Sequence, residues 1–302
     1  MDSLEVKGIV EGALLSGITV LLVVFSFFIP LFGGFALLVS PVPIIILSVR
    51  WGSKISILSS LVVGMILGSL IDPSFALFSI ITIGLIGVSM GSALEEGFSS
   101  KIVFLIGATA VTLAILLLVF INIYILNVDI LALLDEVFRD SLEIYRSIGI
   151  SEDQIEAAGQ TVELMQYIIR VAFISIIFCL GMVVSAVNYY FSIVVLKRLN
   201  YDYSLDFSFR RLRFPKWLGY IYILSVLLIG TDIGKNIFII SNFLVLAQGI
   251  GVTYYYLLRF KLKKAIILFF LILILLIPFV NHLILVIGLL DIWIDFRSLE
   301  KS

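Results

Sequence analysis

Charged residues are scarce in this sequence, and their scarcity decides the class of protein. Asp, Glu, Lys and Arg make up 14% of the 302 residues, whereas hydrophobic residues make up 62%. Soluble domains carry roughly 25% charged and about 45–50% apolar residues. A water-soluble core stops growing near roughly 250–300 residues, so a soluble chain of this composition would leave apolar surface in water. The sequence therefore predicts an all-α membrane protein with lipid around most of its surface.

Several kinds of site lack the residues that they require. Cys179 is the single cysteine and His282 the single histidine, so we expect neither a disulfide within one chain nor a metal site built from these residue types. His282 follows Asn281 in what we interpret as a tight external turn, where a solvated histidine is a simpler interpretation than a catalytic base. The net charge of −1 leaves no basic excess to neutralise phosphates, which argues against nucleic-acid binding.

The sequence also lacks the motifs that energy coupling and catalysis require. The sequence has no Walker A motif for ATP hydrolysis. The apolar runs contain no Asp, Glu, Lys or Arg near mid-depth, where proton-coupled transporters carry such residues. We therefore expect a protein that is not an enzyme and holds no cofactor and no metal ion.

Many apolar runs are long enough to cross a membrane, which takes about 20 helical residues. Pro41 and Pro43 in the second run and Pro278 in the ninth predict kinks. The runs at 217–230 and 283–294 are short, and whether they cross fully is left open. The sequence thus predicts a polytopic helical bundle of about ten transmembrane segments, placed at 9–29, 32–49, 55–71, 74–94, 102–126, 167–196, 217–230, 236–258, 265–280 and 283–294.

The orientation follows from the basic residues of the loops, which gather on the cytoplasmic side. With the N-terminus inside, all basic residues except Arg139, Arg146, Arg170 and Lys235 lie on that side. The pattern holds loop by loop. We therefore predict both ends of the chain in the cytoplasm (N-in and C-in) and location in a bacterial cytoplasmic membrane.

Residues 127–166 form the one long polar stretch, and the predicted topology places them outside. Gly149 suits a helix end, and Ser151 with Gln154 resembles a capping box that starts a second helix running on into the sixth span. The sequence thus predicts an external helical hairpin whose apolar stripe packs on the membrane surface, on the other outer loops or on a partner. Packing over the outer mouth is the plainer interpretation, and the alternatives are a lid over a ligand site and a docking surface. Its first helix has an apolar stripe at Leu131, Leu134, Phe138, Leu142 and Tyr145.

Small residues four apart let helix backbones approach each other closely. The pairs Gly64/Gly68 and Gly87/Gly91 fit packing inside the bundle. Ala13 and Gly17 form another pair at the predicted cytoplasmic end of the first span, where a separate subunit could dock. We take Ala13 and Gly17 as candidate partner-docking residues.

Four further residues are candidates for lining a ligand site. Pro41 and Pro43 interrupt the second span near mid-depth, as in transporters whose broken helices line a site; simple kinking of the helix is the equal alternative. Asn242 and Gln248 are neutral polar residues within the eighth span. Hydrogen bonds between helices are the plainer interpretation of these two amides.

Four stretches carry a resemblance to a known family: EGALLSGITVLL, SPVPIIILSVRWG, AQGIGVTYYYLLRF and GLLDIWIDFR. With them the sequence resembles the YybS-like family of bacterial multi-pass membrane proteins. More distantly, the first six spans are similar to the substrate-binding membrane subunits of energy-coupling-factor vitamin transporters. That similarity implies that Ala13 and Gly17 contact a coupling subunit.

The chain departs from those subunits in the insertion at 127–166 and in four additional C-terminal spans. We therefore divide it into a six-span half, residues 1–196, and a half with a basic loop and four spans, residues 197–302. Two functions compete, while a third, an intramembrane enzyme acting on lipid, has the least support because the polar roles that it needs are unfilled. One is a substrate-binding or transport-associated subunit that depends for energy on a coupling membrane subunit with ABC-type ATPases. The other is a membrane scaffold for cell-envelope or division proteins.

Overall fold

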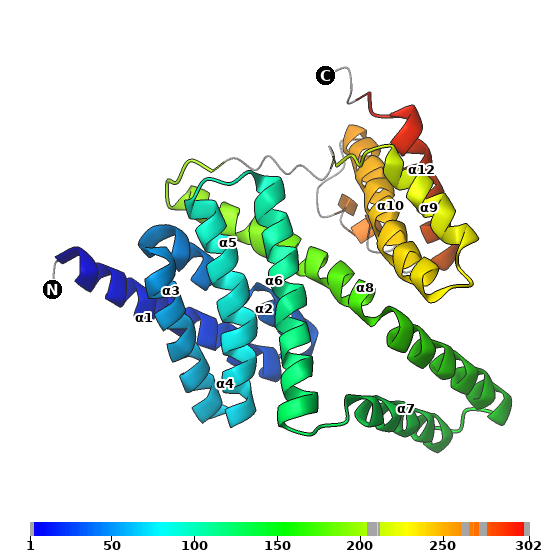
Figure 1. Cartoon of the computed structure of the whole chain (residues 1–302), viewed down its shortest axis with the longest axis horizontal. Coiled ribbons are helices and arrows are strands. Elements are labelled where there is room, and N and C mark those ends of the chain that lie inside the picture. Colours follow the sequence, from blue (N-terminus) through cyan, green and yellow to red (C-terminus); the bar gives the residue numbers. More distant parts are fainter. Residues whose placement is uncertain are drawn as a thin grey trace. The chain divides into compact units, whose positions relative to one another are not determined.

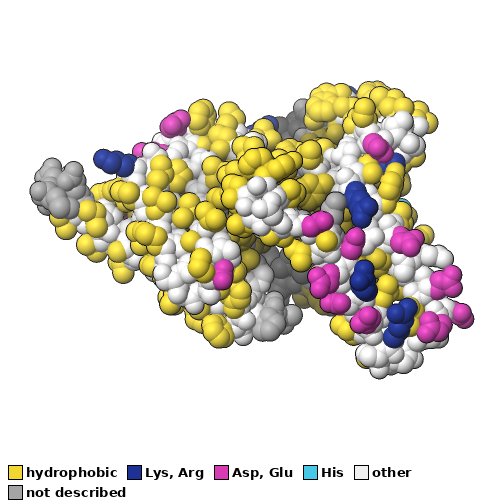
Figure 2. All heavy atoms as spheres, turned by 60° about the horizontal axis from the view of Figure 1, so that its bottom comes forward, with side chains coloured by type: hydrophobic (Ala, Val, Ile, Leu, Met, Phe, Trp, Pro, Cys, Tyr) yellow, Lys and Arg dark blue, Asp and Glu magenta, His cyan; other side chains and the backbone are white. Residues whose placement is uncertain are grey.

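The computed structural model describes residues 3–203, 210, 212–260, 266, 267, 269–271 and 277–298. Every regular element in these ranges is a helix, so the expected all-α class is confirmed (Figure 1). Within the same ranges, six helices are long and apolar enough to cross a membrane. Hydrophobic side chains cover much of the visible surface, as lipid-exposed helices require (Figure 2). The count of ten spans and the orientation stay predictions.

From α1 to α8 the helices follow one another with short connections. Two π-helical segments, η1 and η2, each continue an α-helix without a break in the chain. The elements are α1 (Ser3–Phe28), α2 (Pro30–Val39), α3 (Val42–Leu70), α4 (Pro73–Ser79), η1 (Ile80–Gly84), α5 (Leu85–Glu95), α6 (Ser100–Phe120), η2 (Ile121–Ile125), α7 (Ile130–Ser147), α8 (Glu152–Arg198), α9 (Trp217–Leu227), α10 (Asp232–Arg259) and α12 (Pro278–Ile294).

The chain forms two compact units, and α8 contributes to both. Unit 1 consists of Met1–Met165 and Leu180–Leu205, and unit 2 of Gln166–Cys179 and Asp206–Ser302. The division into membrane halves at residues 196 and 197 stays a prediction. Each unit has its own core.

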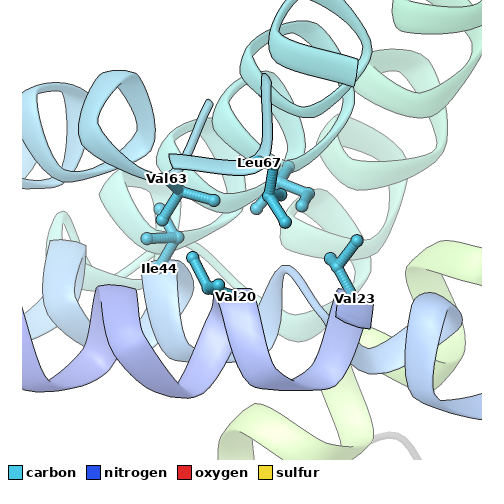
Figure 3. Close-up of a cluster of buried hydrophobic side chains, with 6 residues drawn as sticks. Val20, Val23, Ile44, Val63 and Leu67 are labelled. Carbon is cyan, nitrogen blue, oxygen red and sulfur yellow. The ribbon is translucent and has the colours of Figure 1, made fainter. Parts of the chain in front are cut away.

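The core of unit 1 is built around α3, which doubles back on itself. Gly52 lies inside this helix with φ 81° and ψ 171°, a conformation that glycine adopts without a steric penalty. Ile44 before this point and Val63 after it therefore meet in one buried cluster with Val20 and Val23 of α1 (Figure 3). The turn at Gly52 falls between the second and third predicted spans.

Glycines on α5 and on α3 let α3 approach α4 and α5 closely. A Cβ atom added to Gly87 would lie 2.6 Å from Cγ2 of Ile44. One added to Gly91 would lie 2.8 Å from the Ile45 carbonyl oxygen, and one added to Gly68 would lie 2.7 Å from Cβ of Ala76. The expectation that these glycine pairs serve internal packing is confirmed.

The second predicted span is divided at its prolines. α2 ends at Val39 and α3 begins at Val42, with Pro41 as the N-cap residue between them. The hydroxyl of Ser40 donates to the Leu37 carbonyl oxygen at 2.8 Å and so satisfies one acceptor at the break. The predicted interruption at Pro41 is therefore present as a short break between two helices.

The core of unit 2 joins α9, α10 and α12. Leu218, Val245 and Ile292 form its buried apolar cluster, one from each helix. The backbones of α10 and α12 come into direct contact, because a Cβ atom on Gly288 would lie 2.6 Å from the backbone nitrogen of Gly249. This crossing uses small residues as the crossings in unit 1 do.

The predicted external turn at Asn281 and His282 is wrong. α12 begins at Pro278, so both residues lie inside its first turns. Proline suits the first helical position because the N–H that it lacks would have no partner there. Nδ1 of His282 lies 2.7 Å from the Pro278 carbonyl oxygen. The predicted ninth span at 265–280 lies largely outside the described residues.

The hairpin of α7 and the first part of α8 starts and ends as expected. The Asp129 carboxylate accepts from the Ala132 backbone N–H at 3.0 Å and caps α7, and Gly149 has a φ of 80° at its end. The hydroxyl of Ser151 donates to Oε1 of Gln154 at 3.1 Å. The expected continuation of the second helix into the membrane is seen in α8, which is interrupted only by non-helical angles at Ala172.

Candidate functional site

Unit 2 contains a buried cluster of charged and amide side chains. Gln248 of α10 and Asp291 of α12 are fully buried, and Arg297, just after α12, is 4% exposed. Nη2 of Arg297 lies 2.7 Å from Oδ2 of Asp291, which forms a salt bridge. Nε2 of Gln248 donates to the same oxygen at 2.9 Å. We call these three residues the buried polar cluster.

The buried polar cluster also binds the chain that precedes α9. Arg297 donates to the carbonyl oxygens of Arg210 at 2.9 Å and Leu212 at 2.7 Å. Oε1 of Gln248 accepts from the Phe214 backbone N–H at 2.9 Å. Irregular backbone at the depth of α10 has to be satisfied inside the protein, and the cluster supplies these partners.

This arrangement can hold chain segments together, and its stability depends on the presence of both charges. Asp291 and Arg297 neutralise each other, so no net charge is buried. A buried pair adds little stability over apolar residues, but removal of one partner costs several kcal/mol, roughly 3–5. The second carboxylate oxygen of Asp291 has no hydrogen-bond partner among the described atoms. The chemistry of the cluster is that of a clamp on the 210–214 segment.

Sequence reasoning did not anticipate this cluster. It considered Gln248 by itself, as a candidate ligand-lining residue or a donor between helices. The detectable signal is the ending GLLDIWIDFR, where Asp291 lies six residues before Arg297 and Asp295 is the one other charged residue of the stretch. Spacing of this kind does not reveal that the chain turns back after Asp295, which has a φ of 51°.

A second polar cluster joins α1 to α3 in unit 1. Oε1 of Glu11 lies 2.6 Å from Nε of Arg50, and Oε2 accepts from Nε1 of Trp51 at 2.8 Å. The Arg50 guanidinium lies 5.9 Å from the centre of the Tyr201 ring, beyond the end of α8. The Arg50 guanidinium therefore contacts both Glu11 and the Tyr201 ring within unit 1.

The two partner-docking candidates lie on the open side of α1. Ala13 and Gly17 are exposed, and a Cβ atom on Gly17 would meet no atom within 4 Å. The packed side of α1 uses a different line of small residues, Gly8, Gly12 and Ser16, all of which are buried. A Cβ atom on Gly12 would lie 2.9 Å from Oγ of Ser59 in α3. Sequence reasoning missed this second line.

The ligand-lining candidates divide between the two units. Pro41 and Pro43 are buried in unit 1, and nearby Asn188 donates through Nδ2 to the Leu38 carbonyl oxygen at 2.9 Å. In unit 2, Asn242 is half-buried and Gln248 belongs to the buried polar cluster. Within each unit these residues lie in helix packing, and a ligand at any of them stays a prediction.

The α7–α8 hairpin encloses an open pocket of about 470 Å³. Ile155 is buried at its base, and carboxylates outnumber the one arginine in its wall. In the part of the chain that the structure describes, no group of three His, Cys, Asp or Glu is arranged to hold a metal ion. The pocket is lined by Leu142, Arg146, Glu152, Asp153, Ile155, Glu156, Gly159, Gln160 and Glu163.

Comparison with known proteins identifies relatives across nearly the whole chain. A family model described as "Predicted membrane protein (DUF2232)" matches residues 17–292. The chain is similar to the "Uncharacterized protein YybS" of Bacillus subtilis (strain 168), with 24% identity over 316 residues that cover 98% of this chain and 99% of the relative. The expected resemblance to the YybS-like family is thus confirmed. No solved structure matches the chain, and the similarity to energy-coupling-factor subunits is not shown.

Proposed function

From the premise that this chain belongs to the DUF2232 family of predicted membrane proteins, we propose that it is a transport-associated subunit of a bacterial cytoplasmic membrane. It binds a small molecule, carries out no enzymatic reaction itself and depends on a partner for energy. The partner is a coupling membrane subunit with ABC-type ATPases. Ala13 and Gly17 are the residues through which α1 contacts it.

One observation carries this proposal: α1 has two lines of small residues, and its own bundle uses one of them. Gly8 and Gly12 face α3, where added Cβ atoms would lie 2.9 Å from side-chain atoms. A Cβ atom added to Gly17 would meet no atom within 4 Å. Helix interfaces in membranes are rich in small residues because their backbones approach closely, whereas a lipid-facing position gains nothing from glycine.

The surroundings of Ala13 and Gly17 fit a helix of another membrane protein. Large apolar side chains border the pair and would enclose a partner helix laid against it. These neighbours are exposed on the same side of α1: Val6, Ile9, Val10, Leu14 and Leu21.

The test replaces Ala13 and Gly17 and measures which partner proteins still co-purify with the chain. The full chain carrying Ala13→Leu and Gly17→Leu is purified in mild detergent from its own bacterium beside the wild type. Ile18→Phe is the matched control, because it adds bulk at an exposed position about 100° further round the helix. Supporting results are co-purification of a membrane protein with an ATPase of ABC type, its loss in the double variant and its retention in the control. Identical partners in all three samples would sink the proposal.

The scaffold function is the alternative, and the α7–α8 hairpin favours it. The hairpin pocket has four carboxylates and one arginine in its wall, which suits a basic segment of an envelope or division protein. Removal of residues 129–164 would then abolish partner recruitment while membrane insertion stays normal. If the shortened chain recruits the same partners, the scaffold alternative loses its main element.

A further inference from the structure

Helix α7 has more apolar surface than the hairpin covers. Phe138 and Leu142 are half-buried, one turn apart on the same side of the helix, and Leu142 lines the hairpin pocket. A second apolar line runs along the helix beside them and stays open. Its members are Leu133, Val137, Ile144 and Ile148, with exposed fractions of 49, 60, 59 and 66%. We call these four residues the open apolar line of α7.

The opposite side of α7 is charged. Glu136, Arg139 and Glu143 are exposed and project away from the open apolar line at about 100° per residue, whereas Asp140 lies at its edge, between Val137 and Ile144. Figure 2 shows charged side chains gathered over the α7–α8 hairpin, in contrast to the largely hydrophobic surface elsewhere in that view. A helix with one apolar and one charged half suits a boundary between lipid and water.

The chain holds α7 close to the end of a membrane span. The apolar helix formed by α6 and η2 ends at Ile125, and α7 begins at Ile130. Five residue steps reach at most about 17 Å, so the start of α7 stays near the level where the span leaves the hydrocarbon. In Figure 1, α7 lies across the direction of α6 instead of prolonging it.

Tyrosines mark the same level. Tyr124 in η2 is 70% exposed at the end of the span. Tyr145 borders the open apolar line of α7 and is 43% exposed. Tyrosine is enriched where membranes meet water because its ring is apolar and its hydroxyl is polar.

We infer that α7 lies flat on the membrane surface, with its open apolar line inserted between headgroups and acyl chains. The partner of this face is the lipid itself. The acidic polar side gains nothing from anionic headgroups, so the apolar area and the short tether provide the binding. The inference depends on where the α6–η2 span ends and not on which side of the membrane that end faces. It is independent of the proposed transport function.

The experiment attaches an environment-sensitive fluorophore to single cysteines in the full chain. Cys179 is the only native cysteine, so Cys179→Ala provides a background without reactive thiols. Val137→Cys and Ile144→Cys report the open apolar line, and Glu136→Cys and Glu143→Cys are matched controls on the charged side. Each labelled protein is reconstituted in phosphatidylcholine–phosphatidylglycerol vesicles, with and without brominated phosphatidylcholine. Leu133→Cys replaces either apolar variant that fails to elute as a single species.

The quenching pattern decides the inference. We expect brominated lipid to lower the emission from positions 137 and 144 roughly twofold and to leave positions 136 and 143 nearly unchanged. Water-exposed spectra at all four positions would overturn the inference. So would blue-shifted emission at 137 and 144 that brominated lipid does not quench, because a protein surface would then cover the line.

Discussion

The two units are held together by different means. In unit 1, glycines on α5 meet Ile44 and Ser48 of α3, and the ion pair of Glu11 and Arg50 lies at the partly exposed edge. In unit 2, glycines also bring α10 and α12 together, but a charged pair is buried beside them. The difference teaches that a membrane protein can build one core that is sensitive to volume and another that is sensitive to charge.

Loss of the charge at Asp291 has the largest expected effect. Asp291→Ala leaves the Arg297 guanidinium buried without a counter-charge, and we expect the free energy of unfolding to fall by about 3–5 kcal/mol. Denaturant unfolding in detergent, followed by tryptophan fluorescence, measures the loss. The double variant Asp291→Leu with Arg297→Leu should recover much of it, because neither charge then remains buried. A single variant as stable as the wild type would contradict the clamp.

A larger side chain where α5 contacts α3 in unit 1 should have the second largest effect. The Cβ atom of Gly91→Leu would lie 2.8 Å from the Ile45 carbonyl oxygen. We expect a loss of about 1–3 kcal/mol or more from overpacking, visible as a lower unfolding temperature. Gly17→Leu is the control, because its Cβ atom meets nothing within 4 Å. Equal losses at both positions would mean that α1 is packed on both sides.

Removal of the buried amide should have a smaller effect. Gln248→Leu deprives Asp291 of one donor and the Phe214 N–H of its acceptor. Unsatisfied buried groups cost about 1–3 kcal/mol, and the larger change should be faster proteolysis within residues 210–216. Asn242→Leu on the same helix is the comparison, since Asn242 is half-buried. Unchanged cleavage in Gln248→Leu would show that Arg297 alone holds the segment.

The smallest effect is expected at the edge of unit 1. The side chains of Arg50 and Glu11 are 26% and 24% exposed. Glu11→Gln removes the charge but keeps an acceptor for Trp51, so we expect about 0–1 kcal/mol, shrinking as salt is added. Unfolding temperatures at low and high salt measure the effect. A loss that persists at high salt would place this pair with the buried ones.

The position of glycines illustrates how far sequence reasoning reached. Pairs at a spacing of four predicted close helix contacts, and the pairs at Gly64/Gly68 and Gly87/Gly91 are confirmed in unit 1. The same spacing did not distinguish Ala13/Gly17 from Gly8/Gly12, which lie on opposite sides of α1. Periodicity identifies the face of a helix, whereas a face is buried only if a particular neighbour reaches it.

The turn at the end of the chain shows a second limit. The sequence predicted a turn at Asn281 because polar residues interrupt apolar ones there, yet α12 continues through it from Pro278. A polar residue can remain in a helix when its side chain is exposed, as His282 is. Composition alone could not separate these outcomes.

By itself the sequence determined that the protein is helical and needs lipid, because 62% hydrophobic and 14% charged residues cannot form a soluble fold of this size. It also determined the limits of the α7–α8 hairpin, since capping residues and Gly149 act through neighbours a few positions away. Only the tertiary structure decided that Gln248, Asp291 and Arg297 meet and clamp the segment before α9. That contact joins residues distant in the chain, and such contacts depend on how helices pack rather than on any local pattern.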